Sequence, residues 1–432
     1  MAKTFFIKTY GCQMNLYDEG IVREILKREG YKPTREEEAS LLLILTCAVR
    51  RHAERRALGF LSSLKKLKRE RPERKIGVLG CLAKAWGEKI LSFGADFALG
   101  PDNYQKLPAM IKDSTVGVET ADSSIETYED LLPEPKGVSA FLAIMRGCDN
   151  FCTYCIVPYC RGRERSKKLL KVLAEAESLV KKGVKEIIVL GQNVLAYKDG
   201  ERDFLTLLRE LNSLEGLVRI RFLTSHPKDL SLALIEEIAH LVKQGKVCPE
   251  FHLPLQSGSD KILSLMGRRY TQKEYREKIN YLRQLLPDCA LTTDLMVGFP
   301  GEEEEDFQET LKMVEEIRFD FAYMFKYSER PFTKAKEIEP KVSEKEKQER
   351  LSQLISLQNR ITKEKNEEMI GKIFPVLIEG IKEDGAFGKT PQGKLVIIPS
   401  LSQEGRKGEI YQIKIEKLEG WTPIGTLFKE EK

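Results

Sequence analysis

The stretch Met145-Arg-Gly-Cys-Asp-Asn-Phe-Cys-Thr-Tyr-Cys155 carries the strongest structural signal in this chain of 432 residues. Its three cysteines, Cys148, Cys152 and Cys155, form a C-x-x-x-C-x-x-C motif. Iron–sulfur clusters are normally held by four cysteine thiolates, so three thiolates leave one iron open for a small-molecule ligand. A structural zinc site with Cys160 as the fourth ligand is the alternative. Zinc motifs usually add a distant second pair of cysteines, and no such pair follows, so the spacing favours the cluster.

An open iron in such a cluster can bind S-adenosylmethionine and reduce it to a radical, which is chemistry that cofactors carry and side chains do not. The spacing resembles that of the radical S-adenosylmethionine enzymes. We therefore expect Cys148, Cys152 and Cys155 to be catalytic ligands of a 4Fe-4S cluster.

Strand and helix patterns alternate around this motif from Val138 onward. Expected strands lie near 139–146, 185–190, 218–224, 250–255, 290–297 and 320–327, and expected helices near 167–182, 203–212, 230–243, 259–285, 303–317 and 343–370. Six strand–helix units in series predict an α/β domain over 138–366, a partial (βα)6 barrel that is an incomplete form of the eightfold barrel. Chemistry in such barrels sits at the carboxyl ends of the strands, and the cysteine motif directly follows the first strand.

The segments on either side of the barrel have different patterns. In 1–120, strands at Thr4–Thr9, Leu41–Thr46 and Lys75–Leu79 alternate with helices near 18–29, 52–68 and 84–92, which predicts an N-terminal α/β domain with a parallel sheet. The acidic segment 121–137 is expected to be a linker. Short strands near 374–379, 394–399 and 410–417, separated by glycine turns, predict a small antiparallel β domain over 367–432.

A second set of cysteines follows the strands of the N-terminal domain. Cys12 follows the first strand, Cys47 the second and Cys81 the third. The carboxyl ends of parallel strands lie along one edge of a sheet, where ligands bind, so we expect these three thiols to converge. Free cysteine is also a common small buried residue, and that is the alternative for each taken singly. Together they predict a second cluster with three thiolates and an open iron.

Composition bounds the location and partners of the protein. A net charge of +5 does not by itself indicate a nucleic-acid binder. The longest apolar run, Leu41 to Leu45, is too short to cross a bilayer, and the amino end reaches charged residues too early for a signal peptide. Nine cysteines without a secretory signal favour reduced or metal-bound thiols. We expect a cytoplasmic protein that does not enter a membrane.

Several motifs together resemble one family over nearly the whole chain, the methylthiotransferases of the radical S-adenosylmethionine superfamily, and within it the MiaB-like branch that modifies tRNA. The matching segments are Tyr10-Gly-Cys-Gln-Met-Asn15, Thr46-Cys-Ala-Val-Arg50, Gly80-Cys-Leu-Ala83, Arg146 to Arg165, Gly191-Gln-Asn-Val194, Thr224-Ser-His-Pro227, His252 to Asp260, Asp294 to Glu302 and Tyr327-Ser-Glu-Arg-Pro331. The tail is similar to the TRAM domain. Leu45 and Phe332 depart from the usual pattern, where Asn and Gly are common, and Phe332 changes the expected loop shape.

The resemblance implies a reaction that composition does not reveal: a methylthio group is added at C2 of N6-isopentenyladenosine next to the anticodon of tRNA. It implies two 4Fe-4S clusters, one on Cys12, Cys47 and Cys81, and two S-adenosylmethionine molecules, one for methyl transfer and one for the radical. An aromatic C–H is neither acidic nor electrophilic at neutral pH, so acid–base residues do not activate it and a radical does. The alternatives are a threonylcarbamoyl-adenosine tRNA substrate, a ribosomal protein, or a two-cluster electron carrier without radical chemistry.

Two further groups of residues are candidates for binding. Those expected to contact the cofactor are Tyr154, Gly191, Gln192, Asn193, Ser225, Gln256, Ser257 and Asp294, most of which follow strand ends, where polar groups orient ligands. For Gly191 an ordinary turn, for Ser225 and Asp294 a structural hydrogen bond, and for Tyr154 a core role are the alternatives. Those expected to contact RNA phosphates are Arg50, Arg51, Arg161, Arg163 and Arg165, which flank the proposed clusters.

The resemblance also implies partners: the anticodon stem-loop of tRNA, an electron donor and a sulfur-supplying protein. The sequence does not identify the last two. A monomer is the expected oligomeric state.

Overall fold

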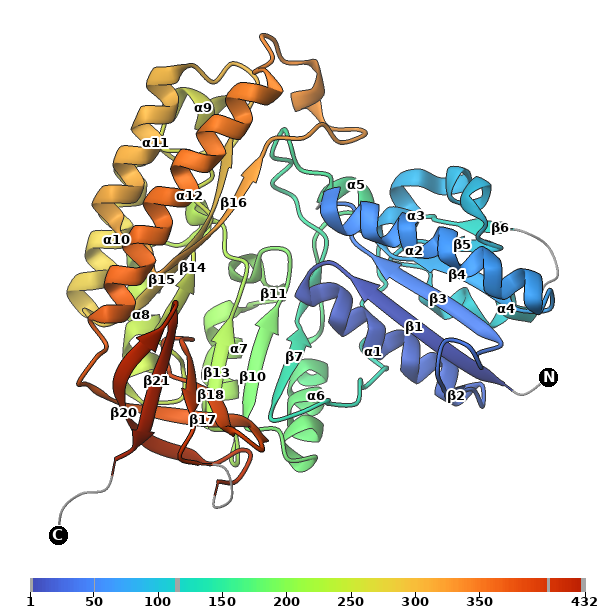
Figure 1. The fold of residues 1–432 in the computed structure, drawn as a ribbon, viewed down its shortest axis with the longest axis horizontal. Coiled ribbons are helices and arrows are strands. Elements are labelled where there is room, and N and C mark those ends of the chain that lie inside the picture. Colours follow the sequence, from blue (N-terminus) through green and yellow to red (C-terminus); the bar gives the residue numbers. More distant parts are fainter. Residues whose placement is uncertain (1–2, 50, 113–116, 402–404, 429–432) are drawn as a thin grey trace.

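The computed structural model describes residues 3–49, 51–112, 117–401 and 405–428. Figure 1 shows three parts in chain order: an α/β domain at the amino end, a curled sheet with outer helices, and a small β domain at the carboxyl end. The N-terminal domain lies beside the first strands of the curled sheet. The short helices α5 (Val157–Arg161) and α9 (Asp260–Leu265) lie at one end of those strands, and the small β domain packs against the other end.

The N-terminal domain is a parallel sheet with helices on both faces. Its strands lie in the order β2 (Lys32–Pro33), β1 (Thr4–Tyr10), β3 (Leu41–Thr46), β4 (Lys75–Leu79), β5 (Phe97–Leu99) and β6 (Gly117–Glu119), and its helices are α1 (Gln13–Arg28), α2 (Arg51–Glu70), α3 (Cys81–Trp86) and α4 (Leu107–Lys112). The central strand β3 is buried throughout, because α1 covers one face of the sheet and α2 the other. The expected sheet is confirmed.

The middle domain contains the six expected strand–helix units. The strands are β7 (Ser139–Ala143), β10 (Glu186–Leu190), β13 (Arg219–Phe222), β14 (Glu250–His252), β15 (Ala290–Val297) and β16 (Phe321–Lys326). The helices are α6 (Leu169–Lys181), α7 (Phe204–Ser213), α8 (Leu232–Lys243), α9 (Asp260–Leu265), α10 (Gln272–Leu285), α11 (Glu304–Ile317) and α12 (Glu344–Glu367). Short elements in the loops are β8 (Met145–Arg146), α5 (Val157–Arg161), β9 (Arg165–Ser166), β11 (Lys198–Asp199) and β12 (Arg202–Asp203).

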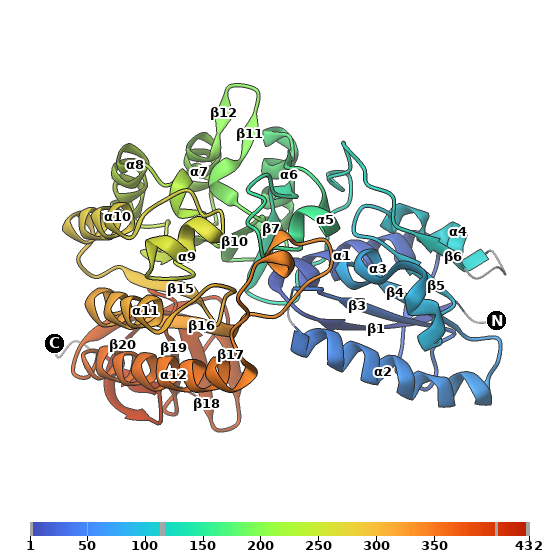
Figure 2. The same ribbon diagram turned by 90° about the horizontal axis from the view of Figure 1, so that it is seen from above.

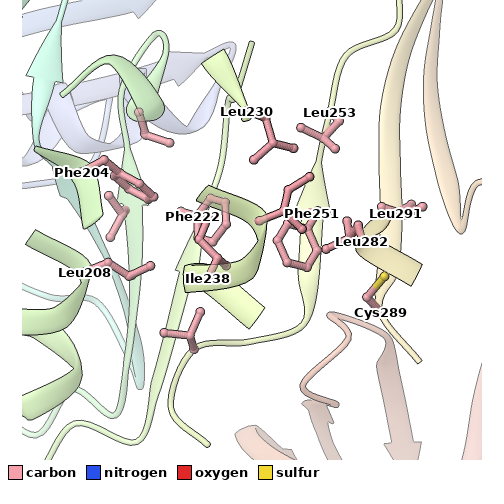
Figure 3. Close-up of a cluster of buried hydrophobic side chains, with 14 of the residues drawn as sticks. Phe204, Leu208, Phe222, Leu230, Ile238, Phe251, Leu253, Leu282, Cys289 and Leu291 are labelled. Atoms are coloured by element: carbon pink, nitrogen blue, oxygen red, sulfur yellow. The ribbon is translucent and has the colours of Figure 1, made fainter. Parts of the chain in front are cut away.

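These strands form two parallel three-stranded sheets, β7-β10-β13 and β14-β15-β16, that curl into a partial barrel. Figure 2 shows the helices wrapped around the outside of this barrel, with the N-terminal domain beside α5. The layer between strands and helices is filled by apolar side chains, as Figure 3 shows. Phe222 lies edge-on to Phe204 at 5.4 Å and to Phe251 at 5.8 Å between ring centroids, which joins the core of one sheet to that of the other.

The C-terminal domain is a closed barrel of β17 (Ile373–Lys382), β18 (Gly385–Lys389), β19 (Leu395–Ile398), β21 (Thr422–Leu427) and β20 (Ile410–Glu419), in that order. The sequence predicted three of these strands and missed β18 and β21. Pairing is antiparallel as expected, except that β19 and β21 are parallel neighbours. Arg219 of β13 donates hydrogen bonds to the carbonyls of Lys389 (2.6 Å) and Pro375 (2.7 Å), which fastens this domain to the partial barrel.

The segment 121–137 has no helix or strand, as a linker would, but it is packed against both neighbouring domains. Tyr128 is buried, stacks on Tyr104 with ring centroids 5.5 Å apart, and donates a hydrogen bond to the carbonyl of Pro101 (2.8 Å). This aromatic side chain thus packs the segment expected to be a linker against the N-terminal domain. None of the helices in the described ranges is long and apolar enough to span a membrane.

Candidate active site

The three N-terminal cysteines meet at one edge of the sheet. β1, β3 and β4 are adjacent and in register, with Tyr10 opposite Thr46, so the residues after each strand lie side by side. Cys12 caps α1, Cys47 follows β3 and Cys81 begins α3. The positions of Cys12 and Cys47 are so close that a Cβ on the neighbouring Gly11 would lie 2.5 Å from the Cβ of Cys47. The convergence predicted from strand ends is what the structure contains.

The thiols in this group perturb one another. A hydrogen bond with the Cys47 thiol lowers the pKa of Cys12 and raises that of Cys47, while the buried Arg161 guanidinium lowers the pKa of Cys12 further. A hydrogen bond with the Cys160 thiol lowers the pKa of Cys81, and Arg161 again adds to the effect. Since thiolate is the metal-binding form, a cation at this position favours metal binding.

Cys160 belongs with this N-terminal group and not with the cysteines that precede it in sequence. Its buried side chain packs with Ala48, Cys81 and Ile156, and its thiol lies 3.5 Å from the carbonyl oxygen of Cys81. Cys160 therefore packs against the N-terminal cysteines. The zinc alternative required it as the fourth ligand beside Cys148, Cys152 and Cys155, so the structure argues against that alternative. Sequence reasoning considered Cys160 only as the fourth ligand of the zinc alternative, because its neighbour Cys81 is distant in the chain.

Cys148, Cys152 and Cys155 lie in the loop between β8 and α5, at the carboxyl end of the first barrel strand. Cys148 accepts a hydrogen bond from the Asn150 side-chain amide (3.5 Å), and Cys152 accepts one from the buried Arg268 guanidinium (3.6 Å). Burial raises the pKa of Cys148 to about 11 and raises that of Cys155 as well. These thiols release protons when they bind metal, so metal binding here is favoured by higher pH.

Each set offers three thiolates, which is one fewer than the four that normally hold an iron–sulfur cluster. In the part of the chain that the structure describes, no group of three or more His, Cys, Asp or Glu side chains is arranged to hold one metal ion. Zinc needs sulfurs about 2.3 Å from a single centre. An iron–sulfur cluster places an inorganic core between its ligands, so its thiolates are farther apart.

Helix α5 connects the two sets. It starts just after Cys155 and ends just after Cys160, and it packs against α3, which begins at Cys81. A cleft of about 620 Å³ opens at this junction, with Ala48, next to Cys47, on one wall and Ile156, next to Cys155, on the other. The remaining lining residues are Arg51, Glu54, Ala85, Trp86, Lys89, Tyr327, Ser328, Glu329, Arg330, Pro331, Glu344 and Lys347. The cleft between the two domains is thus lined by a direct sequence neighbour of one cysteine from each set, Cys47 and Cys155.

A buried charge cluster holds the two domains together beneath this cleft. Asp18 of α1 is fully buried and pairs with Arg146 (2.5 Å) and Arg161 (2.9 Å) of the barrel domain. Burial raises the pKa of Asp18, but the two guanidinium groups outweigh it and hold the pKa below its usual range. Arg146 also lies 4.6 Å from the ring centre of Tyr128. Neither Asp18 nor Arg146 was singled out from the sequence.

The arginines predicted to contact RNA divide into buried and exposed groups. Arg161 and Arg165 are buried, Arg161 against Asp18 and Arg165 against Asp102 (2.7 Å), so their predicted role as phosphate contacts is wrong. Both guanidinium groups balance carboxylates at the domain interface. Arg163 is exposed beside the cluster loop.

The other basic run follows Cys47. Arg51 is exposed at the start of α2 and lines the cleft, which keeps it as a candidate for RNA contact. Arg50 lies outside the described residues. Lys167, which follows the cysteine motif, is buried and pairs with Glu175 (2.8 Å), so it too is a structural residue.

The predicted cofactor residues after β10 and β13 differ in whether their polar atoms already have hydrogen-bond partners within the protein. Ser225 Oγ and Gln192 Oε1 are buried and have no hydrogen-bond partner among the described residues, which fits a polar ligand. Asn193 is engaged at both ends of its amide, by the His226 backbone N–H (3.0 Å) and by Asp229 (2.7 Å), so it holds the turn. Gly191 is needed for packing, because a Cβ there would lie 2.6 Å from Cγ of Met145.

The remaining predicted cofactor residues lie around the later strands. Tyr154 packs edge-on to Phe299 with ring centroids 6.4 Å apart, which matches the core alternative. Ser257 is fully buried and hydrogen-bonded to Thr310 and Ser259, so it is structural.

Gln256 and Asp294 are more open to a ligand. Gln256 adopts a positive φ of 70°, which a non-glycine residue rarely does, next to the barrel strand that carries Asp294. The Asp294 carboxylate lies 3.6 Å from the ring of His252 and is partly exposed. Both side chains remain candidates for binding a polar ligand.

Arg330 is a further site residue that the sequence did not reveal. Its buried guanidinium reaches across the cleft from the barrel domain to Glu54 (3.0 Å) and to the carbonyl of Val49 (2.8 Å). It lies inside the matching segment Tyr327 to Pro331, but its partners are far away in sequence, so the segment did not reveal its role. It fixes the loop after β16 against the segment that follows Cys47.

Comparison with known proteins agrees with this architecture. The chain matches the model of the radical SAM superfamily over residues 142–314, that of the uncharacterized protein family UPF0004 over 4–100 and that of the TRAM domain over 367–428. Among solved structures it is similar to the radical S-adenosylmethionine methyltransferase TsrM from Kitasatospora setae, with a TM-score of 0.58 at 14% identity over 78% of this chain and 77% of that one. This likeness concerns the fold alone.

Curated relatives match almost end to end. One is the tRNA-2-methylthio-N(6)-dimethylallyladenosine synthase of Thermoanaerobacter pseudethanolicus, 44% identical over 98% of this chain and 92% of the relative. Another is the protein of the same name from Thermodesulfovibrio yellowstonii, 42% identical over 96% of each chain. Identity at this level and coverage, together with the three matched domains, shows that the chain belongs to the tRNA-2-methylthio-N(6)-dimethylallyladenosine synthase family of radical S-adenosylmethionine enzymes.

Proposed function

We propose that this protein is a tRNA methylthiotransferase that adds a methylthio group at C2 of N6-isopentenyladenosine next to the anticodon. The observation that carries the proposal is that each domain holds a three-cysteine set and that Ala48 and Ile156, the neighbours of Cys47 and Cys155, line one cleft and pack with Cys81. The relatives named for this reaction support the substrate assignment.

Each thiol set has its own role in this proposal. Cys148, Cys152 and Cys155 hold the 4Fe-4S cluster that binds S-adenosylmethionine, and Cys12, Cys47 and Cys81 hold the second 4Fe-4S cluster. When bound, these cofactors supply the radical that removes the C2 hydrogen, and the sulfur and methyl group that replace it. Three thiolates in each set leave one iron position for a ligand that is not protein.

The surrounding residues bind, orient and exclude water. Ser225 and Gln192 offer unpartnered buried oxygens to the polar groups of S-adenosylmethionine. Arg268 donates to the Cys152 sulfur and thereby holds one ligand of the first cluster in place. The buried carboxylate of Asp18 with its two arginines closes the base of the site to solvent and fixes the distance between domains.

The RNA side of the proposal rests on the open cleft and the C-terminal barrel. Arg51 and Lys89 line the cleft and offer positive charge to the phosphates of an anticodon stem-loop. A TRAM domain matched over 367–428 supplies a second surface for the tRNA. We further propose that the protein works in the cytoplasm as a monomer, with separate proteins supplying electrons and sulfur.

The test is anaerobic turnover of the cluster-loaded full chain with S-adenosylmethionine, a chemical reductant and tRNA that carries isopentenyladenosine. We expect 5′-deoxyadenosine and the 2-methylthio nucleoside, both measured by mass spectrometry. A Cys47→Ala variant should still make 5′-deoxyadenosine without the methylthio product. If the enzyme modified only tRNA that carries threonylcarbamoyl-adenosine, or only a ribosomal protein, the proposed substrate would be wrong. If the wild type made no 5′-deoxyadenosine, the alternative of a two-cluster electron carrier would be favoured.

A further inference from the structure

Three aromatic side chains form a continuous exposed row beside the cysteine loop. Phe151 lies edge-on to Tyr159, with ring centroids 6.1 Å apart, and Tyr159 lies at 6.0 Å from Phe332, with their planes 33° apart. Phe332 is 61% exposed and Phe151 39% exposed, while Tyr159 is half-buried between them. We call these three residues the aromatic rim.

The aromatic rim is assembled from distant parts of the chain. Phe151 comes from the cysteine loop, Tyr159 from α5, and Phe332 from the loop after β16. Phe151 and Phe332 have positive φ values of 47° and 69°, a conformation that is unfavourable for bulky side chains. Strained backbone and exposed apolar rings both lower the stability of the fold. Their presence at one place therefore indicates that the rings bind a ligand.

The position and charge of the aromatic rim identify the kind of ligand. Two residues that line the cleft adjoin the rim: the Ile156 carbonyl accepts a hydrogen bond from the Tyr159 backbone N–H (3.1 Å), and Pro331 directly precedes Phe332. The guanidinium of Arg163 lies 5.2 Å from the ring centre of Phe151, with its side chain 72% exposed. Its carboxylate partner is Asp149 (3.0 Å), and Lys334 and Lys336 are exposed on the far side.

We propose that the aromatic rim is a stacking platform for the unpaired bases that flank the modified adenosine. This inference rests on the proposed function and adds the residues that present the loop. Base faces stack on aromatic rings whatever their sequence, and adjacent cations bind the phosphates between them. Moving an adenine out of its stack costs a few kcal/mol, which stacking of its neighbours on the rim offsets.

The key variant is Phe332→Gly, because glycine adopts a positive φ without strain. If the ring served the fold, this change would lower stability; as a stacking residue, its loss should leave thermal stability unchanged or slightly higher. Affinity for a synthetic anticodon stem-loop should fall about tenfold, within the range for removing one base–aromatic stack. Phe332→Trp, which keeps an aromatic ring at this position, should bind the stem-loop with an affinity close to that of the wild type. Tyr281→Ala, which removes a partly exposed aromatic ring on the outer helix α10, is the matched control and should bind as the wild type does.

Salt dependence separates the rings from the charge. Affinity is measured by fluorescence anisotropy on the anaerobic, cluster-loaded protein at several salt concentrations. Phe151→Ala and Phe332→Gly should weaken binding equally at every salt concentration. Arg163→Gln should lower the slope of log affinity against log salt by about 0.7, as expected for one phosphate contact to a single strand. The ring variants and the wild type should bind a blunt duplex of the stem sequence with the same affinity, because the bases of a duplex are not available for stacking.

The outcomes are distinct. If the wild type binds and modifies the stem-loop while Phe332→Gly and Phe151→Ala match it in affinity, the stacking platform is refuted and the proposed function stands. If the ring variants bind RNA normally but lose the rate of reduction by a protein reductant, the rim is a protein-docking surface and the proposal is also refuted. If the wild type neither binds nor modifies the stem-loop, the proposed function itself fails.

Discussion

Replacing Asp18 by Asn tests whether the two domains are held together by buried charge. The substitution keeps the shape of the side chain and removes its charge, which leaves the buried guanidinium groups of Arg146 and Arg161 without the carboxylate that they share. Two nitrogens of Arg146 and one of Arg161 already lack any hydrogen-bond partner among the described residues, so no carboxylate in reach compensates. Removing one partner of a buried ion pair costs about 3–5 kcal/mol, and here one carboxylate serves two pairs, so we expect at least that loss.

The assay is urea unfolding followed by the fluorescence of Trp86 in the N-terminal domain. A Trp421→Phe background removes the signal of the C-terminal barrel, where Trp421 is exposed. Asp149→Asn is the matched control, because Asp149 pairs with Arg163 at 3.0 Å on the surface and should cost no more than about 1 kcal/mol. A loss for Asp18→Asn no larger than that of the control would refute the role of the charge cluster.

Replacing Asp18 by Asn should also change how the free energy of unfolding depends on pH. The pKa of Asp18 is lower in the folded protein than its ordinary value of 3.8, so the folded state holds the proton less well than the unfolded state. The stabilisation is therefore complete above that value and is lost as the pH falls through it. Wild type should lose stability between pH about 5 and about 3 more steeply than Asp18→Asn. Equal slopes over that interval would contradict the assignment.

Three further predictions concern the clusters, the cysteine loop and the domain contact. Anaerobically reconstituted Cys148→Ala and Cys47→Ala should each retain about half the iron of the wild type by colorimetric assay, if each set holds its own cluster; complete loss in either variant would contradict this. Gly147→Ala should prevent stable folding, because its Cβ would lie 1.9 Å from a backbone oxygen, whereas Gly183→Ala, with the same sign of φ but open space, should lower stability by only about 1 kcal/mol in thermal unfolding. Arg219→Met should speed proteolysis between the barrel and C-terminal domains, because two hydrogen bonds to the carbonyls of the latter are lost; an unchanged cleavage rate would show that other contacts hold it.

The features that sequence predicted correctly are those with a local cause. Strands such as Leu41–Thr46 are apolar along their whole length, and the residues after them lie at one sheet edge by the geometry of parallel sheets. For that reason the meeting of Cys12, Cys47 and Cys81 follows from three short segments without any knowledge of the rest. The partial barrel follows in the same way from the regular alternation of strand and helix.

The errors about the arginines have their physical origin in long-range pairing. A run of cations such as Arg161, Arg163 and Arg165 suggests a surface, because isolated buried charge is costly. In the structure two of the three are neutralised by Asp18 and Asp102, which lie far away in sequence and carry no local signal. The strands β18 and β21 were missed for a different reason: their glycines weaken the strand pattern, although a closed barrel satisfies their backbone.

The short helix α5 explains why buried arginines are placed where RNA contacts were expected. A methylthio transfer needs its radical and its sulfur source within reach of one substrate atom, so the relative position of the two thiol sets must be fixed. Helix α5 begins two residues after Cys155 and carries Cys160 near its end, and Arg161 at its last position pairs with the Asp18 carboxylate of α1, the helix whose N-cap position is Cys12. A domain hinge at this point would have to break that buried ion pair. The arginine that resembles a phosphate ligand in the sequence is thus used to hold the helix that follows Cys12 against the barrel domain.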